Sequence, residues 1–182
     1  MAYEEPSAIL QAALDAERAN HPEDAIRTVE ALLDDNKLPA ADVVTAWNVF
    51  GLSYADEERF NEARGAYERA ISAFKTISEE RSMPSELGDL LSNLADVYSK
   101  TNQFDVVLHL RLKALRAYQQ ANNVAGAARS YANLAAIELS QGHLPPAKKY
   151  VVEGSAALPK ATDMETDDRA MFYTIRAWEL EK

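Results

Sequence analysis

The stretch Trp47-Asn48-Val49-Phe50-Gly51-Leu52-Ser53-Tyr54 determines the fold that we expect for this chain of 182 residues. Its large apolar side chains recur at the spacing of a helix, and Gly51 places a residue without a side chain among them. A second small residue, Ala63, follows twelve positions later. Because a small residue lets a neighbouring helix backbone approach closely, this spacing predicts two helices that pack tightly against each other.

Small residues recur at equivalent places along the whole chain, roughly forty residues apart, which indicates stacked helix pairs. In the first helix of each pair these residues are Ala13, Gly51, Ala95, Ala135 and Ala177. Their partners in the second helices are Ala25, Ala63, Val107 and Ala147. Each pair is expected to bury its apolar face against the next one.

Prolines and short polar stretches divide the chain into elements, because proline is favoured in the first turn of a helix and in connections. We expect helices at 6–20, 22–36, 40–56, 59–80, 85–101, 104–121, 124–141, 144–158 and 167–182. The unbroken run from Arg64 to Glu80 predicts an unusually long second helix in the second pair. The expected fold class is all-α. It is a right-handed α-solenoid of about four antiparallel helix pairs (6–36, 40–80, 85–121 and 124–158) plus a C-terminal helix, in a single domain over 1–182.

The charge balance argues against nucleic acid and anionic membranes as partners. The chain has 29 acidic and 19 basic residues and a net charge of −10, so it lacks the clustered cations that phosphates require. No apolar run is long enough to span a membrane. The absence of cysteine excludes disulfides and thiolate metal sites, and a cytoplasmic location is the default expectation.

The pattern resembles the tetratricopeptide repeat family, and its spacing of about forty residues is similar to that of longer-repeat members such as those resembling kinesin light chain. The first stretch, 47–54, continues through Phe60, Ala63 and Tyr67. Related copies occupy 91–98 and 131–138. The resemblance implies a non-enzymatic adaptor or scaffold that docks a peptide segment in a concave groove lined by the first helices of the pairs.

Two asparagines at the same place in successive first helices, Asn93 and Asn133, are the main candidates for peptide contact. Family members that hold extended peptides often use asparagine there, because a carboxamide both donates and accepts hydrogen bonds. The alternative is that these side chains bond only a neighbouring helix or solvent. The full set of expected peptide-binding residues is Asn48, Asp89, Asn93, Asp96, Arg129 and Asn133. This mixture of charges suits a protein or peptide that bears at least one basic side chain.

Catalysis, cofactors and metals receive no support from the sequence. His21, His109 and His143 lack the spacing of metal ligands, and adjacent acidic residues are typical of solvated helix ends. We therefore expect no enzyme activity, no cofactor and no metal site.

The C-terminal segment 167–182 resembles the first helix of a further repeat whose second helix is absent. It is expected to cap the last pair. The alternatives are a self-assembling domain that uses this helix as an oligomer interface, and the sensory part of a larger regulator.

Overall fold

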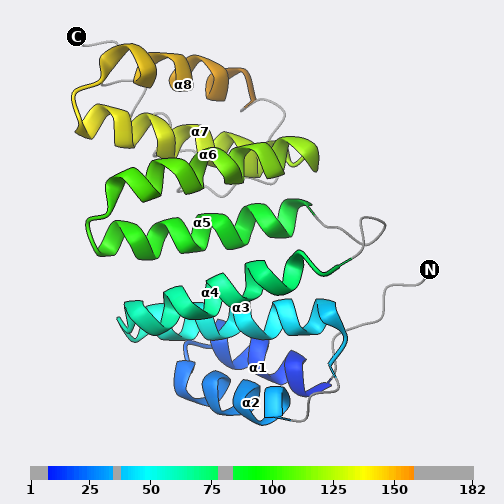
Figure 1. Ribbon diagram of the computed structural model, residues 1–182. Coiled ribbons are helices and arrows are strands. Elements are labelled where there is room, and N and C mark those ends of the chain that lie inside the picture. Colours follow the sequence, from blue (N-terminus) through cyan, green and yellow to red (C-terminus); the bar gives the residue numbers. More distant parts are fainter. Residues whose placement is uncertain (1–7, 35–37, 78–83, 158–182) are drawn as a thin grey trace. The chain divides into compact units, whose positions relative to one another are not determined.

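The computed structural model describes residues 8–34, 38–77 and 84–157, and these residues form helices and short connections without any strand (Figure 1). The helices are α1 (Ala8–Arg18), α2 (Pro22–Asp34), α3 (Ala40–Asp56), α4 (Phe60–Phe74), α5 (Pro84–Lys100), α6 (Phe104–Gln120), α7 (Val124–Ser140) and α8 (Leu144–Ala157). The all-α helical repeat fold is confirmed. The expected helix at 167–182 lies outside the described residues.

Contacts between residues divide the chain into two compact units. The first unit is Met1–Ser82 with Asp96–Asn102, and the second unit is Met83–Ala95 with Gln103–Lys182. In the first unit α1 packs on α2, α2 on α3, and α3 on α4. In the second unit α6 packs on α7 and α7 on α8. The single domain over 1–182 stays a prediction.

The small residues of the repeat pattern lie in the core, as the spacing predicts. Alanines 13, 25, 63, 95, 135 and 147 are buried, and so are Gly51 and Val107. In the first unit they pack among larger side chains such as Leu10, Val29 and Phe50. Burial of these aliphatic and aromatic side chains is the main stabilising contribution.

Gly51 on α3 lies at a close approach between two helices of the first unit. A Cβ atom added to Gly51 would lie 2.4 Å from the ring of Tyr67 on α4, well inside the van der Waals limit. Tyr67 is 1% exposed, so its ring has no room to retreat. The absence of a side chain at position 51 therefore lets α3 and α4 pack at their observed separation.

A second tyrosine, Tyr118 on α6, has the same role in the second unit and contacts two glycines. A Cβ atom on Gly88 of α5 or on Gly126 of α7 would lie 2.6 Å or 2.4 Å from the Tyr118 ring. Tyr118 is fully buried. The ring thus packs against the bare backbones of two helices, one before it and one after it in the chain.

The turns after five of the helices share one conformation. The residue in the left-handed region is Asn20, Glu58, Asn102, Asn122 or Gly142. In the turns at Asn20, Glu58, Asn122 and Gly142 the next amide donates to a carbonyl five residues back, as in the bond from the His143 amide to the Glu138 carbonyl at 2.8 Å. This is the Schellman arrangement, which satisfies the last carbonyls of a helix and reverses the chain.

Helix α4 is shorter than the sequence indicates. The prediction of helix up to Glu80 is wrong, because α4 ends at Phe74. The Thr76 amide and hydroxyl both donate to the Ala73 carbonyl, at 3.0 and 2.7 Å, and the Ile77 amide donates to Phe74 at 3.1 Å. These three-residue bonds replace the α-helical ladder, and the threonine hydroxyl competes for the carbonyl that would continue it.

Gly51→Ala and Gly65→Ala place the same methyl group on the same helix pair with opposite expected results. The first should lower the unfolding free energy by about 1–3 kcal/mol, because the methyl group overlaps Tyr67. The second should raise it by about 0.5–1 kcal/mol, because a Cβ on Gly65 meets no atom within 4 Å and alanine favours the helix. Urea unfolding followed by circular dichroism measures both. Shifts of the same sign would contradict the packing described for α3 and α4.

Candidate functional site

An ion pair joins two of the expected peptide-binding residues in the second unit. The Arg129 guanidinium of α7 lies 3.8 Å from the Asp89 carboxylate of α5, and the two side chains are 39% and 51% exposed. Because the pair is partly solvated, its own contribution to stability is small. The pair does show that two helix faces lie next to each other, the face of α5 that carries Asp89 and the face of α7 that carries Arg129.

The same Asp89 carboxylate accepts a hydrogen bond from the buried Tyr118. The distance from the Tyr118 hydroxyl to Asp89 Oδ1 is 2.6 Å, and Ser92 Oγ lies 3.5 Å from that hydroxyl. Burial, and next the bond to Asp89, raise the pKa of Tyr118 to about 12. Asp89 is therefore bonded to a tyrosine of α6 and paired with an arginine of α7. The sequence predicts a packing position for Tyr118, but it does not predict either of these two interactions of Asp89.

Asn93 and Asn133 follow Asp89 and Arg129 by four residues on α5 and α7. Residues four apart lie on the same face of a helix, one turn further along. Both asparagines are half-buried. The register of the ion pair thus brings the two carboxamides to neighbouring turns of adjoining helices. Contact with a peptide stays a prediction.

The other two expected residues, Asn48 on α3 and Asp96 on α5, belong to the first unit. Asn48 is half-buried and Asp96 is exposed. Asp96 is one of three carboxylates that act on the buried Tyr67. Burial first, and then Asp96, Asp56 and Glu17, raise the pKa of that tyrosine.

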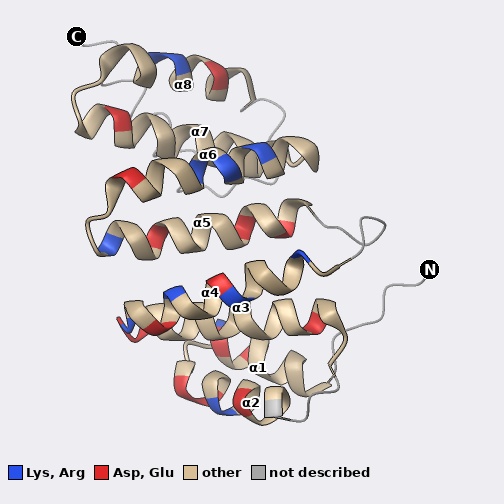
Figure 2. Cartoon of the chain, in the orientation of Figure 1, with Lys and Arg blue, Asp and Glu red and all other residues tan. Residues whose placement is uncertain are grey.

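Acidic residues occur on each of α1, α2 and α3 (Figure 2). Two of them, Glu17 of α1 and Asp56 of α3, raise the pKa of Tyr67 as Asp96 does. Burial, followed by the charge of Asp56, raises the pKa of the Glu17 carboxyl. The first unit therefore concentrates negative charge around one tyrosine. Glu17 and Asp56 were not identified from the sequence, because they fall at helix ends where acidic residues are common.

Metal binding and membrane insertion find no counterpart in the described helices. Within the described ranges, no group of three or more His, Cys, Asp or Glu side chains could hold a metal ion. None of the helices there combines the length and the apolar character that a membrane crossing requires. His143 is bonded to the buried Glu138, with 2.9 Å between Nδ1 and Oε2, so this histidine ties the turn after α7 to its helix.

Solved structures with a similar fold come from helical repeat proteins. The Cut9–Hcn1 hetero-tetramer of the APC/C matches with a TM-score of 0.69 at 12% identity, over 92% of this chain and 29% of that chain. A putative kinesin light chain with nearly identical TPR-like repeats from Podosopora anserina matches with a TM-score of 0.69 at 16% identity, over 98% of this chain and 92% of that chain. BtubC (BKLC) from P. vanneervenii matches with a TM-score of 0.61 at 17% identity, over 93% of this chain and 63% of that chain.

The chain has a tetratricopeptide-type repeat fold. No protein-family model matches the chain, and no curated protein matches its sequence. The likeness is therefore one of three-dimensional structure at low sequence identity. Repeat folds of this type generally serve as scaffolds for protein–protein interaction.

Tyr118→Phe keeps the ring between Gly88 and Gly126 and removes only the hydroxyl that donates to Asp89. We expect the unfolding free energy at neutral pH to fall by about 1 kcal/mol. The folded-state pKa of Tyr118 lies above that of an unfolded tyrosine, so its contribution is present below about pH 10 and is lost as the pH rises toward 12. The difference in unfolding free energy between wild type and variant, measured by urea titration, should therefore decrease as the pH rises from about 10 toward 12.

Tyr98→Phe is the matched control, because the Tyr98 hydroxyl makes an exposed bond of 3.4 Å to Glu68. This substitution should leave the unfolding free energy nearly unchanged. Equal costs for the two variants would mean that the Tyr118–Asp89 bond does not stabilise the second unit.

Proposed function

We propose that this chain is a non-enzymatic interaction module that docks an extended peptide segment on the first helices of its pairs. The fold supports an interaction scaffold, because similar repeats occur in a protein assembly, the Cut9–Hcn1 hetero-tetramer. The peptide site itself is argued from the residues of α5 and α7.

One observation carries the proposal, namely the ion pair between Asp89 and Arg129. It fixes which turns of α5 and α7 adjoin, and Asn93 and Asn133 occupy the next turn of each. Two carboxamides on neighbouring helices can bond to the amide and carbonyl groups of one extended backbone. Such bonds would hold a peptide in register without selecting its side chains.

In the first unit, taken by itself, Asp96 acts on Tyr67 together with Glu17 and Asp56. Three carboxylates in one region favour a peptide with basic side chains. Asn48 supplies a further amide on α3. In the second unit Arg129 is paired with Asp89, so this arginine is expected to position the surface rather than to bind an acidic ligand.

The cytoplasm is the proposed location, because a chain without cysteine has no disulfide to gain from an oxidising compartment. The alternatives, a self-assembling domain or the sensory part of a larger regulator, depend on 167–182. That segment lies outside the described residues, and nothing in the described helices favours these alternatives.

The combined variant Asn93→Ala with Asn133→Ala should weaken peptide binding at least tenfold. A tenfold loss corresponds to about 1.4 kcal/mol, which is the size of one or two net hydrogen bonds. The probe is the tightest basic peptide that the wild-type chain selects from a random library of unstructured peptides. Fluorescence anisotropy of the labelled peptide gives the affinity, and the melting temperature should stay nearly unchanged.

Asn61→Ala is the control, because Asn61 is an exposed asparagine on α4. It should leave the affinity of the same peptide unaltered. The groove assignment is rejected if the double variant binds that peptide as tightly as the wild type.

A further inference from the structure

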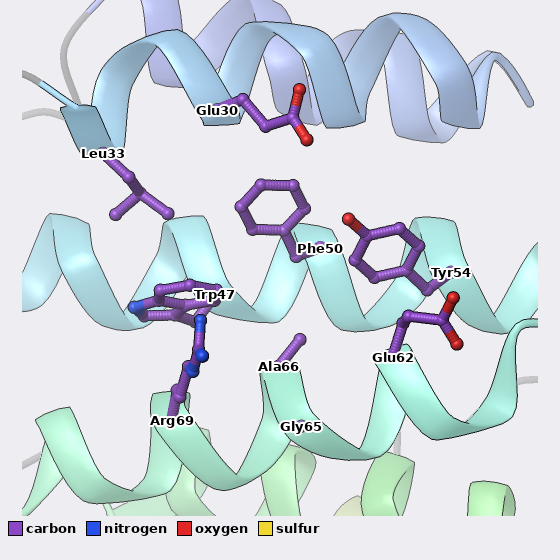
Figure 3. Close-up of a pocket in the computed structure, with 9 residues that line it drawn as sticks. All are labelled: Glu30, Leu33, Trp47, Phe50, Tyr54, Glu62, Gly65, Ala66 and Arg69. Carbon is purple, nitrogen blue, oxygen red and sulfur yellow. The ribbon is translucent and has the colours of Figure 1, made fainter.

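A cavity of about 590 Å³ lies over α3 in the first unit, bordered by α2 on one side and α4 on the other (Figure 3). Its volume falls within the usual range for sites that bind small molecules. The repeat pattern does not predict it, and the expected peptide-binding residues are not among its lining. Asn48 follows Trp47 by one position on α3 but projects from the helix about 100° away from it.

Three aromatic rings of α3 form the floor of the cavity. The centroids of Trp47 and Phe50 are 5.3 Å apart, and those of Phe50 and Tyr54 are 5.5 Å apart with the planes 3° from parallel. Spacings of three and four residues place the rings in one row along the helix. Trp47 and Tyr54 are half-buried, whereas Phe50 between them is only 4% exposed, so the two outer rings form the accessible part of the row.

The opposite wall stays open because α4 carries small residues there. Gly65 and Ala66 line the cavity, and a Cβ added to Gly65 would meet no atom within 4 Å. A larger residue at position 65 would project into the cavity. The glycine therefore keeps the space above the rings empty without contributing to the packing of the helix.

The rings at both ends of the row already carry cations from within the chain. The guanidinium carbon of Arg69 lies 4.6 Å from the Trp47 ring centroid, and that of Arg59 lies 4.4 Å from the Tyr54 centroid. Aromatic faces attract guanidinium groups through their quadrupole. Among the described residues, the middle ring, Phe50, carries no such cation.

An unpaired carboxylate faces this middle position. Figure 3 shows the Glu30 side chain of α2 directed toward the rings of Phe50 and Tyr54 from the side opposite α4. Glu30 forms no ion pair within the described part of the chain, whereas Glu62 at the far end is bonded to Arg59 at 3.2 Å. A cation that enters beside Phe50 would therefore meet one available carboxylate and the half-exposed ring of Tyr54.

We propose that this cavity binds an arginine side chain of a partner protein, with the guanidinium against Glu30 and the half-exposed ring of Tyr54. Arginine is favoured over lysine because its planar group stacks on rings and donates to a carboxylate at the same time. The site is separate from the peptide surface on α5 and α7, and it gives the module a second point of attachment.

The test uses the variant Trp178→Phe, which leaves Trp47 as the single tryptophan of the full chain. The probe is acetyl-Gly-Arg-Gly-amide, compared with the same peptide in which citrulline replaces arginine. Citrulline has nearly the same shape without the charge. We expect a saturable change in Trp47 emission with a millimolar dissociation constant for the arginine peptide, and binding at least fivefold weaker for the citrulline peptide. Calorimetry provides an independent measurement.

Two substitutions in this reporter chain locate the site. Glu30→Gln should weaken the arginine peptide at least fivefold, and Gly65→Leu should abolish its binding by filling the cavity. The control Glu23→Gln makes the same change at an exposed position on the same helix and should have no effect. Urea unfolding verifies that Gly65→Leu is folded. Asn93→Ala with Asn133→Ala should leave this binding unchanged, which separates the cavity from the proposed peptide surface.

Several outcomes would overturn the proposal. They are equal binding of the arginine and citrulline peptides, an equal loss in Glu23→Gln and Glu30→Gln, and the absence of a saturable signal. Tighter binding of acetyl-Gly-Leu-Gly-amide or acetyl-Gly-Glu-Gly-amide would assign the cavity to an apolar or an anionic side chain instead.

Discussion

Contact between a buried tyrosine ring and a helix backbone that lacks a side chain is the constraint on which both units depend. Tyr67 packs against Gly51, and Tyr118 packs against Gly88 and Gly126. In each case the ring occupies the volume that a Cβ would need, so the helices cannot separate without opening a void or approach without a clash. Because the helices are held in place at these contacts, nearby side chains are held in place as well. The bond from Tyr118 to Asp89 is an example, because the ring can reach that carboxylate only when the glycines admit it.

The first unit could be predicted from the sequence because its decisive residues repeat. Gly51 and Ala63 sit twelve positions apart in a pattern that recurs with Ala95 and Val107, so periodicity alone places them in the core. Seven of the eight described helices both begin and end within about two residues of their predicted positions, a typical error for such predictions. The exception, α4, ends early through hydrogen bonds of Thr76 that propensity does not reveal.

The contacts of the second unit could not be predicted in the same way. Gly88 and Gly126 lie outside the repeating small positions, and their importance depends on which ring crosses them in space. The same applies to Asp89 and Arg129, which were expected among the residues that contact a peptide. They are paired with each other. A count of charged residues along a sequence overstates the charge that a surface presents to a ligand, because ion pairs within the chain neutralise some of these residues.

The common turn after α1, α3, α6 and α7 has a consequence for how the protein reaches its folded state. A Schellman turn is completed by bonds over at most five residues, so each reversal of the chain forms from local sequence alone. Contacts between successive helices are likewise close in sequence, and proteins dominated by such contacts fold quickly. Nucleation can start at any helix pair and spread to its neighbours, as in a one-dimensional array. The order in which the pairs form is then set by their separate stabilities and not by the position of any pair along the chain.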